Sequence, residues 1–214
     1  MTTYKNQKPL KILVIIVGVL TGMAGIAFAQ EKVTVIGEKD EMQTLFTYDA
    51  NITGYGSWDN KFTQLAGQDA MIIGAHGGVI FNSYFSFGLG AYGSATTVDI
   101  AGTNPETSLD LSMGYTGLMM GFNVMPRKVV HFSIPLFVGV GNLELEHNNA
   151  FVENSAFLLF EPGLQLEVNV VQFMKIGLGG GYRMVHGINL RNPVTDEDLT
   201  YWTGNFSLIF GKFR

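Results

Sequence analysis

The feature that most constrains the fold is an alternation of apolar with small or polar residues, repeated in segments of about ten residues. It runs from Ala70 to Phe213, and in its clearest segment the apolar residues are Val130, Phe132, Ile134, Leu136, Val138 and Val140. A period of two is typical of a β-strand with two different faces. Because the opposite face is small or polar, it cannot fill a hydrophobic core. The alternation therefore predicts a barrel whose apolar face points outward into lipid.

The segments predict an all-β protein: an eight-stranded antiparallel up-and-down transmembrane β-barrel with short periplasmic turns and longer extracellular loops. The expected strands are 49–57, 70–81, 84–98, 108–124, 129–145, 155–168, 172–186 and 199–213. Tight turns are expected at 82–83, 125–128 and 169–171, and longer links at 58–69, 99–107, 146–154 and 187–198. An even strand number with this alternation of connections puts both mature ends in the periplasm of a Gram-negative bacterium.

The first residues predict export from the cytoplasm. Lys5, Lys8 and Lys11 precede an apolar run, and Ala27-Phe28-Ala29 resembles a cleavage site. We expect a Sec signal peptide at 1–29, a short periplasmic segment at 30–48 and the barrel at 49–214. A single helical membrane anchor is the alternative for the first segment.

Composition narrows the class of function. Without the three lysines of residues 1–29, 10 of the 13 Lys and Arg residues remain against 18 Asp and Glu, a net charge of −8. Such an acidic chain is a poor partner for nucleic acid. The absence of cysteine excludes disulfides, iron–sulfur clusters and thiol catalysis. No metal-ligand spacing or cofactor motif stands out, so we expect no cofactor.

Charged residues fall on the small-residue faces, which argues against a soluble barrel such as a lipocalin. A soluble barrel would have a mainly apolar interior. We predict an internal polar plug, with Gln165 opposite Lys175 and Glu167 nearby. Arg183 is expected to pair with an acid, either Asp110 or Glu161. An ion path through the lumen is the alternative to a plug.

Two irregularities are expected in the barrel wall. Pro135 and Pro162 lie within strands, where proline removes a hydrogen bond, and a hairpin centred near residue 150 places them almost opposite each other. They predict a weakened lateral seam, which resembles the proline-flanked wall openings of the lipid A palmitoyltransferase barrel; a pair of local bulges is the alternative. Within 108–124 the large apolar residues also change from odd to even positions in the sequence. This change of parity predicts a β-bulge near Thr116-Gly117.

Some residues resemble a known family. The stretches 47–56 and 61–70, and more loosely the hairpins up to 210–213, resemble small outer-membrane β-barrel proteins of Bacteroidetes-type bacteria, of the OmpX and OmpA barrel type. The resemblance implies partnership with outer-membrane lipid, lipopolysaccharide and, through the C-terminal strand, the barrel-assembly machinery. We expect a monomer.

We expect a non-enzymatic protein with an envelope-structural or surface-loop binding or adhesion role. One alternative is a lipid-modifying barrel enzyme with lateral access at Pro135 and Pro162, for which His186 with Ser94 or Ser155 is the candidate group. The other alternative is a narrow small-solute pore.

Overall fold

The computed structural model describes residues 51–101, 108–147, 150–191 and 194–213. The expected signal peptide at 1–29, the expected periplasmic segment at 30–48 and the first two residues of the expected first strand lie outside the described residues. No helix among the described residues is long and apolar enough to cross a membrane.

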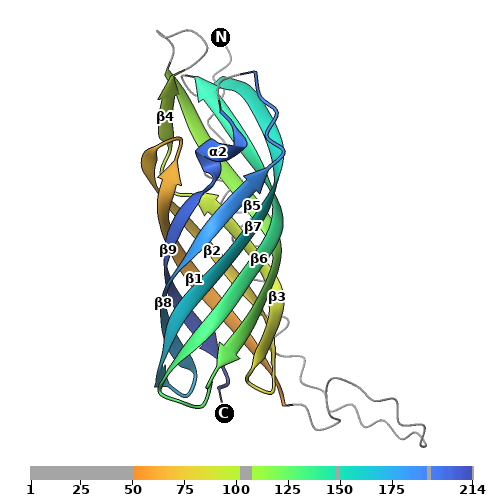
Figure 1. Cartoon of the computed structure of the whole chain (residues 1–214), viewed down its shortest axis with the longest axis vertical. Coiled ribbons are helices and arrows are strands. Elements are labelled where there is room, and N and C mark those ends of the chain that lie inside the picture. The colour runs from red at the N-terminus through yellow and green to blue at the C-terminus, as the bar shows by residue number, and fades with distance from the viewer. Residues whose placement is uncertain (1–50, 102–107, 148–149, 192–193, 214) are drawn as a thin grey trace, which may run out of the picture. The chain divides into compact units, whose positions relative to one another are not determined.

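Strands dominate the described chain and close into a ring. Neighbouring strands are antiparallel in the order β3-β2-β1-β9-β8-β7-β6-β5, and β3 also pairs with β5 (Figure 1). This confirms the predicted eight-stranded antiparallel barrel. The elements are β1 (Ile52–Leu65), β2 (Gln68–Phe81), β3 (Phe85–Ser94), β4 (Val98–Ala101), β5 (Ser108–Val124), β6 (Val130–His147), β7 (Ala150–Val171), β8 (Met174–His186), α2 (Asp196–Leu199) and β9 (Tyr201–Gly211).

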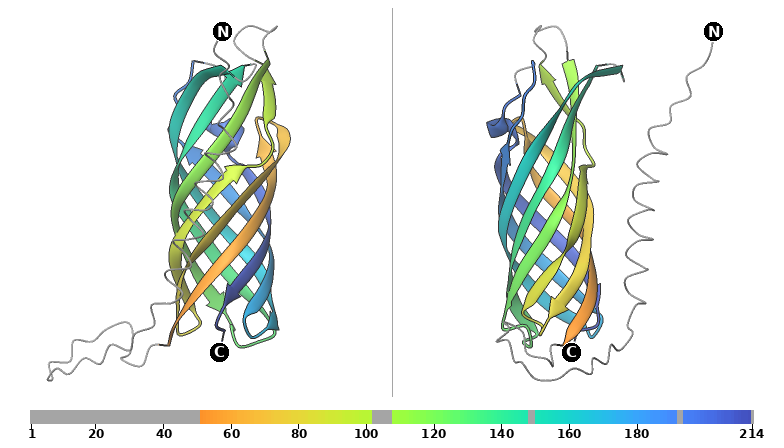
Figure 2. Two further views of the ribbon diagram at one scale, coloured as in Figure 1. Left: turned by 180° about the vertical axis from the view of Figure 1, so that it is seen from behind. Right: turned by 90° about the vertical axis from the view of Figure 1, so that its right-hand side faces the viewer.

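The two ends of the barrel differ. β1 begins at the end where β9 finishes, since Tyr55 pairs with Gly211, and we name this the terminal end. The opposite end, here named the loop end, carries α2 and the short strand β4, which pairs only with β5 among the described strands. Both views in Figure 2 show tilted strands, with β4, β5, β6 and β7 extending furthest at the loop end. Neither β4 nor α2 was predicted from the sequence.

The first hairpin differs from its prediction. The expected loop at 58–69 is strand almost throughout, and β1 and β2 meet at the two-residue turn Ala66-Gly67. Both turn residues have positive φ, 48° and 77°, which matches the twist of a tight hairpin and suits glycine. The sequence prediction was wrong because Asp59 and Lys61 looked like loop charges, whereas both side chains are buried inside the barrel.

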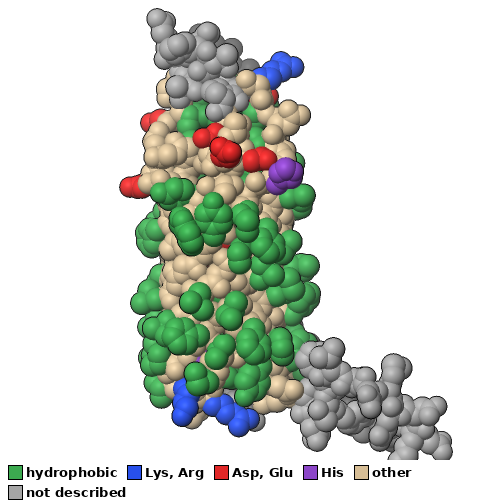
Figure 3. Space-filling model, viewed as in Figure 1, with side chains coloured by type: hydrophobic (Ala, Val, Ile, Leu, Met, Phe, Trp, Pro, Cys, Tyr) green, Lys and Arg blue, Asp and Glu red, His purple; other side chains and the backbone are tan. Residues whose placement is uncertain are grey.

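Large apolar side chains cover the outside of the wall. On β7 the outward residues Leu158, Phe160, Leu164 and Leu166 are 37–60% exposed, while Glu161 between them is 7% exposed. The face of the barrel in Figure 3 has hydrophobic side chains over its lower and middle parts, acidic groups above and Lys or Arg below. This polarity is the reverse of that of a soluble barrel, as the alternation predicted.

The predicted bulge near Thr116-Gly117 is wrong. β5 keeps an unbroken register with both β3 and β6 through this point. The apolar residues change parity because they change sides: Leu111 and Tyr115 are buried inside, whereas Leu118 is 41% exposed on the outside. The strand is regular, and it is the polarity of its two faces that inverts toward the loop end.

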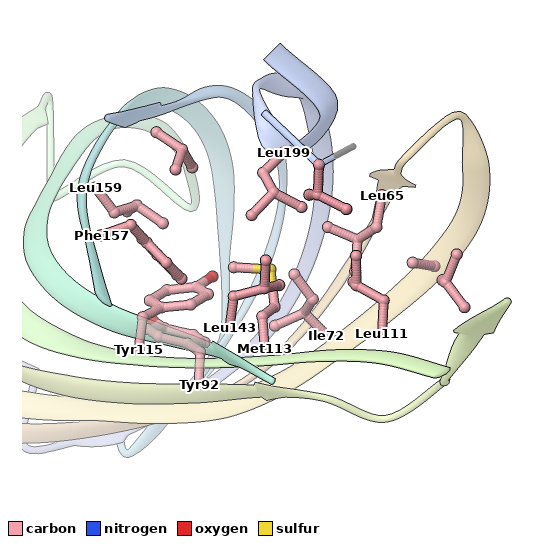
Figure 4. Close-up of a cluster of buried hydrophobic side chains, with 14 of the residues drawn as sticks. Leu65, Ile72, Tyr92, Leu111, Met113, Tyr115, Leu143, Phe157, Leu159 and Leu199 are labelled. Carbon is pink, nitrogen blue, oxygen red and sulfur yellow. The ribbon is translucent and has the colours of Figure 1, made fainter. Parts of the chain in front are cut away.

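The loop half of the barrel interior is therefore an apolar core. Its members come from almost every strand of the ring and from the α2 region, and Figure 4 shows ten of them pointing toward one another. Leu65, Ile72, Leu111, Leu143, Leu145 and Leu199 have no exposed surface at all. On β5 and β6 the outward residues at this level are small or polar, among them Ser112 and Glu144, which pair across the two strands. The loop half has the polarity of a water-soluble barrel, and the terminal half has that of a membrane barrel.

Candidate functional site in the barrel lumen

The middle of the lumen is crossed by an ion pair. Lys61 of β1 donates to Glu161 of β7, with 2.8 Å between Nζ and Oε1, and both side chains are almost completely buried. The Lys61 ammonium also lies 4.2 Å from the centre of the Tyr92 ring and 3.3 Å from the Tyr115 hydroxyl oxygen. Thr203 of β9 donates a further hydrogen bond to Glu161. Two strands that are not neighbours in the ring are thus connected through one buried pair.

A second network lies nearer the terminal end. Glu167 of β7 accepts from Lys175 of β8 at 3.2 Å, and its Oε2 lies 3.1 Å from Nε2 of His131 on β6. The Lys175 ammonium lies 4.3 Å from the centre of the Phe213 ring. These side chains fill the lumen where β6, β7 and β8 are adjacent.

A third network joins β1, β2 and β3. Asp59 accepts hydrogen bonds from Ser57 at 2.7 Å and from the Tyr92 hydroxyl at 2.8 Å, and its Oδ2 lies 2.6 Å from Nδ1 of His76. Since Asp59 is only 2% exposed, these three partners replace the water that a free carboxylate would bind.

Arg183 lies next to the apolar core, on the side of the terminal end, and has no exposed surface. Its Nε donates to the carbonyl of Leu199 at 2.8 Å, and Nη2 donates to the carbonyl of Gln64 and the hydroxyl of Thr63. The side chain therefore ties the end of α2 to the β1–β2 hairpin. No carboxylate among the described residues lies within ion-pair distance of it, so the expected pairing with Asp110 or Glu161 is not what the structure has.

The buried charges balance across the lumen as a whole. Three carboxylates, Asp59, Glu161 and Glu167, face three cations, Lys61, Lys175 and Arg183, among the described residues. A cavity of about 60 Å³ remains beside the three carboxylates and the two lysines, with space for a few water molecules. Glu161 Oε2 and Asn205 Oδ1 have no hydrogen-bond partner among the described residues, and water in this cavity is their expected partner.

The structure brings together most of the residues singled out in the sequence. Glu161, Gln165, Glu167, Lys175 and Arg183 are all buried in the lumen. Lys175 lies opposite Asn169 rather than Gln165, because β7 continues to Val171 and the chain turns at Gln172-Phe173 instead of at the expected 169–171. Asp110 is placed elsewhere: it lies at the loop end, level with Asp99 and Glu146 and between two buried leucines.

Sequence reasoning missed the part of the site that β1 contributes. Ser57, Asp59, Lys61 and Thr63 alternate with Trp58, Asn60 and Phe62, and this alternation was the available signal. It is weak because Asn60 interrupts the apolar set on the outer face.

The two prolines lie side by side in the wall. Pro162 pairs with Leu136, the residue after Pro135. The β6–β7 pairing is interrupted at Ile134 and Pro135, and the β7–β8 pairing at Glu161 and Pro162. Proline has no N–H to donate, which accounts for interruptions next to these residues. Opening of this seam stays a prediction.

The candidate Ser/His group has other partners. His186 Nδ1 lies 3.1 Å from Asp196 and the imidazole is almost fully exposed. The hydroxyl of Ser155 accepts from the backbone N–H of Asn189, and that of Ser94 accepts from the N–H of Met113. His186, Ser94 and Ser155 therefore do not form a hydrogen-bonded group with one another in this structure.

Comparison with known proteins identifies the fold. No protein-family model matches the chain, and no curated protein sequence matches it. Among solved structures, Neisserial surface protein A is similar with a TM-score of 0.53 and 12% identity, over 77% of this chain and 99% of that one. The N-terminal β-barrel domain of Pseudomonas aeruginosa OprF has a TM-score of 0.53 and 8% identity, over 76% and 99%.

A third similar structure is Ail, the attachment invasion locus protein of Yersinia pestis, in complex with the heparin analogue sucrose octasulfate. It has a TM-score of 0.41 and 13% identity, over 76% of this chain and 97% of that one. The two structures with the higher scores show the fold alone, at identities this low. The chain has the fold of the small outer-membrane β-barrels.

Proposed function

We propose that this chain is an integral outer-membrane protein whose closed barrel anchors a loop-end surface outside the cell. In this proposal the terminal end faces the periplasm and the role is non-enzymatic, either envelope-structural or in binding and adhesion at the loop end. The observation that carries the proposal is the inverted polarity of the terminal half, where the wall is apolar outside and charged inside. Outer-membrane lipid and lipopolysaccharide are the partners that such a wall requires.

The filled lumen supports an anchor over a small-solute pore. Eight strands leave an interior that side chains can occupy, and here the charges are paired at mid-lumen while the loop half is packed with apolar side chains. A solute would have to displace both layers. The aromatic residues that flank the apolar band of β9, Trp202 and Phe210, are 68% and 45% exposed, as expected of side chains at membrane interfaces.

The loop end supplies the surface for the proposed binding role. Its exposed or half-exposed charges are mostly acidic: Asp69, Asp99, Glu144, Asp196 and Glu197. The narrower resemblance to Bacteroidetes-type barrels, recognition by the barrel-assembly machinery and the signal peptide stay predictions.

Two measurements test the proposal. Outer-membrane fractions should contain the protein in a form that migrates faster on a gel without boiling than after boiling, because the closed barrel resists detergent. The purified barrel should give no discrete conductance steps in planar bilayers. A soluble protein with unshifted migration would contradict membrane insertion, and regular conductance steps would favour the pore.

The interrupted pairing at Pro135 and Pro162 is what favours the second candidate, a lipid-modifying enzyme with lateral access. The measurement that decides this candidate is the mass spectrum of lipid A from a strain that lacks this protein. Unchanged lipid A would remove this candidate and leave the anchor.

A further inference from the structure

Asn60 occupies an unusual position on the outer wall. Since Asp59 and Lys61 point into the lumen, Trp58, Asn60 and Phe62 point outward, and the two aromatic residues are 40% and 57% exposed. β1 crosses the front of the barrel in the left panel of Figure 2. Asn60 is half-buried on this apolar surface.

The register gives the depth of Asn60 in the membrane band. Asn60 lies opposite Phe206 of β9 and Ile73 of β2. Phe206 is four residues from Trp202 on one side and four from Phe210 on the other. Asn60 is therefore near the middle of the band that the proposed function places in hydrocarbon.

The carboxamide of Asn60 has no hydrogen bond to any described residue. Thr116 of β5 is also outward-facing, but its hydroxyl donates to the carbonyl of Gly90 at 3.0 Å. An unpaired amide in hydrocarbon is costly, because acyl chains offer neither donors nor acceptors. A partner that contacts the Asn60 carboxamide must therefore provide both a hydrogen-bond donor and an acceptor.

Glycines lie near Asn60 on the outer wall, beyond its aromatic neighbours. Gly204 of β9 pairs with Phe62 and is exposed, and it pairs on its other side with the exposed Gly180 of β8. On the opposite flank Gly56 of β1 pairs with Gly77 of β2. Small residues let the backbones of two membrane proteins come near each other, and polar side chains then bond across the contact.

We propose that the outer face of β9, β1 and β2 is an interface between two copies of this chain, with the two Asn60 carboxamides paired across a two-fold axis. A carboxamide carries a donor and an acceptor, so two copies satisfy each other with two hydrogen bonds. Two-fold symmetry brings the same residue to both sides of the contact. This proposal differs from the monomer expected from the sequence, and it rests on the proposed membrane location.

The absence of cysteine from the chain gives a direct test. A single cysteine can cross-link only to its counterpart in a second copy. Under oxidation of native outer membranes, Gly204→Cys, which keeps the Asn60 carboxamide, is expected to give a disulfide-linked dimer. Val138→Cys, outward-facing on the opposite wall in β6, is the matched control and should stay monomeric. Failure of Gly204→Cys to cross-link, or equal cross-linking of both variants, would overturn the proposed interface.

A double variant tests the amide itself. Adding Asn60→Leu to Gly204→Cys should lower the cross-linked fraction about three- to tenfold. Unchanged cross-linking in the double variant would contradict the amide pairing. Heat-modifiable migration of each variant separates the two proposals: if it persists without cross-linking, the dimer is wrong and the membrane barrel stands.

Discussion

Replacing Lys61 with methionine is expected to lower the free energy of unfolding by about 3–5 kcal/mol. The change leaves the Glu161 carboxylate buried without its cation, and only Thr203 still donates to it. Methionine has a similar length, so the loss of charge rather than a large cavity dominates the effect. The measurement is reversible urea unfolding of the barrel in lipid vesicles.

A double variant separates the ion pair from general damage to the lumen. Glu161→Gln combined with Lys61→Met removes both charges and should recover much of the stability lost in the single variant, because no uncompensated charge remains. If Lys61→Met alone leaves the unfolding free energy unchanged, the buried pair at mid-lumen is refuted.

Truncating the apolar core at the loop end should have the next largest effect. Leu143→Ala is expected to lower the free energy of unfolding by about 2–5 kcal/mol. Leu143 has no exposed surface and is surrounded by other core side chains, so its removal leaves a cavity inside the barrel.

Leu118→Ala provides the matched control in the same unfolding experiment. Leu118 lies on β5, the strand next to that of Leu143, but it faces outward and is 41% exposed. Lipid chains can fill the space that its truncation leaves, so no cavity term applies and the loss should be clearly smaller. A larger loss for Leu118→Ala than for Leu143→Ala would contradict the assignment of inner and outer faces.

The sequence predicted the wall of the barrel well because period two is a local property. The strands that carry Val138, Leu164 and Leu178 have the inner and outer faces that their alternation indicated. The turn at Asn82 and Ser83, whose positive φ angles form a tight hairpin, also followed from local residues. The connections expected at 58–69 and 169–171 did not, since the chain turns at Ala66-Gly67 and at Gln172-Phe173.

Features that depend on partners across the lumen could not be predicted in this way. Lys61 looks like a loop residue until Glu161, 100 residues later, is known to neutralise it. Arg183 was expected to need an acid, but backbone carbonyls of Gln64 and Leu199 bind it instead. Backbone acceptors carry no sequence signal, since every residue has one.

The inversion within β5 shows a different limit of the alternation. A change in the parity of the apolar residues can have either of two causes. One is a bulge that rotates the strand, and the other is a change from polar to apolar surroundings, or the reverse, on each face of a regular strand. Leu111 and Leu118 have the same chemistry, and only the polar residues beside them at each level indicate which face meets water. Asp110 and Ser112, outward at the loop end, were the signal that the outer face becomes polar at this level.

The most direct test of the whole account is lipid contact along the outer face of β6. Single cysteines at Ile134, Val138 and Glu144, all outward-facing, can carry a fluorescent label in vesicles made with brominated lipid. Strong quenching at the first two positions and weak quenching at Glu144 is the predicted result, since the apolar band ends between Val138 and Glu144. Absence of quenching at all three positions, or equal quenching at all three, would contradict a barrel whose terminal half lies in lipid and whose loop half rises above it.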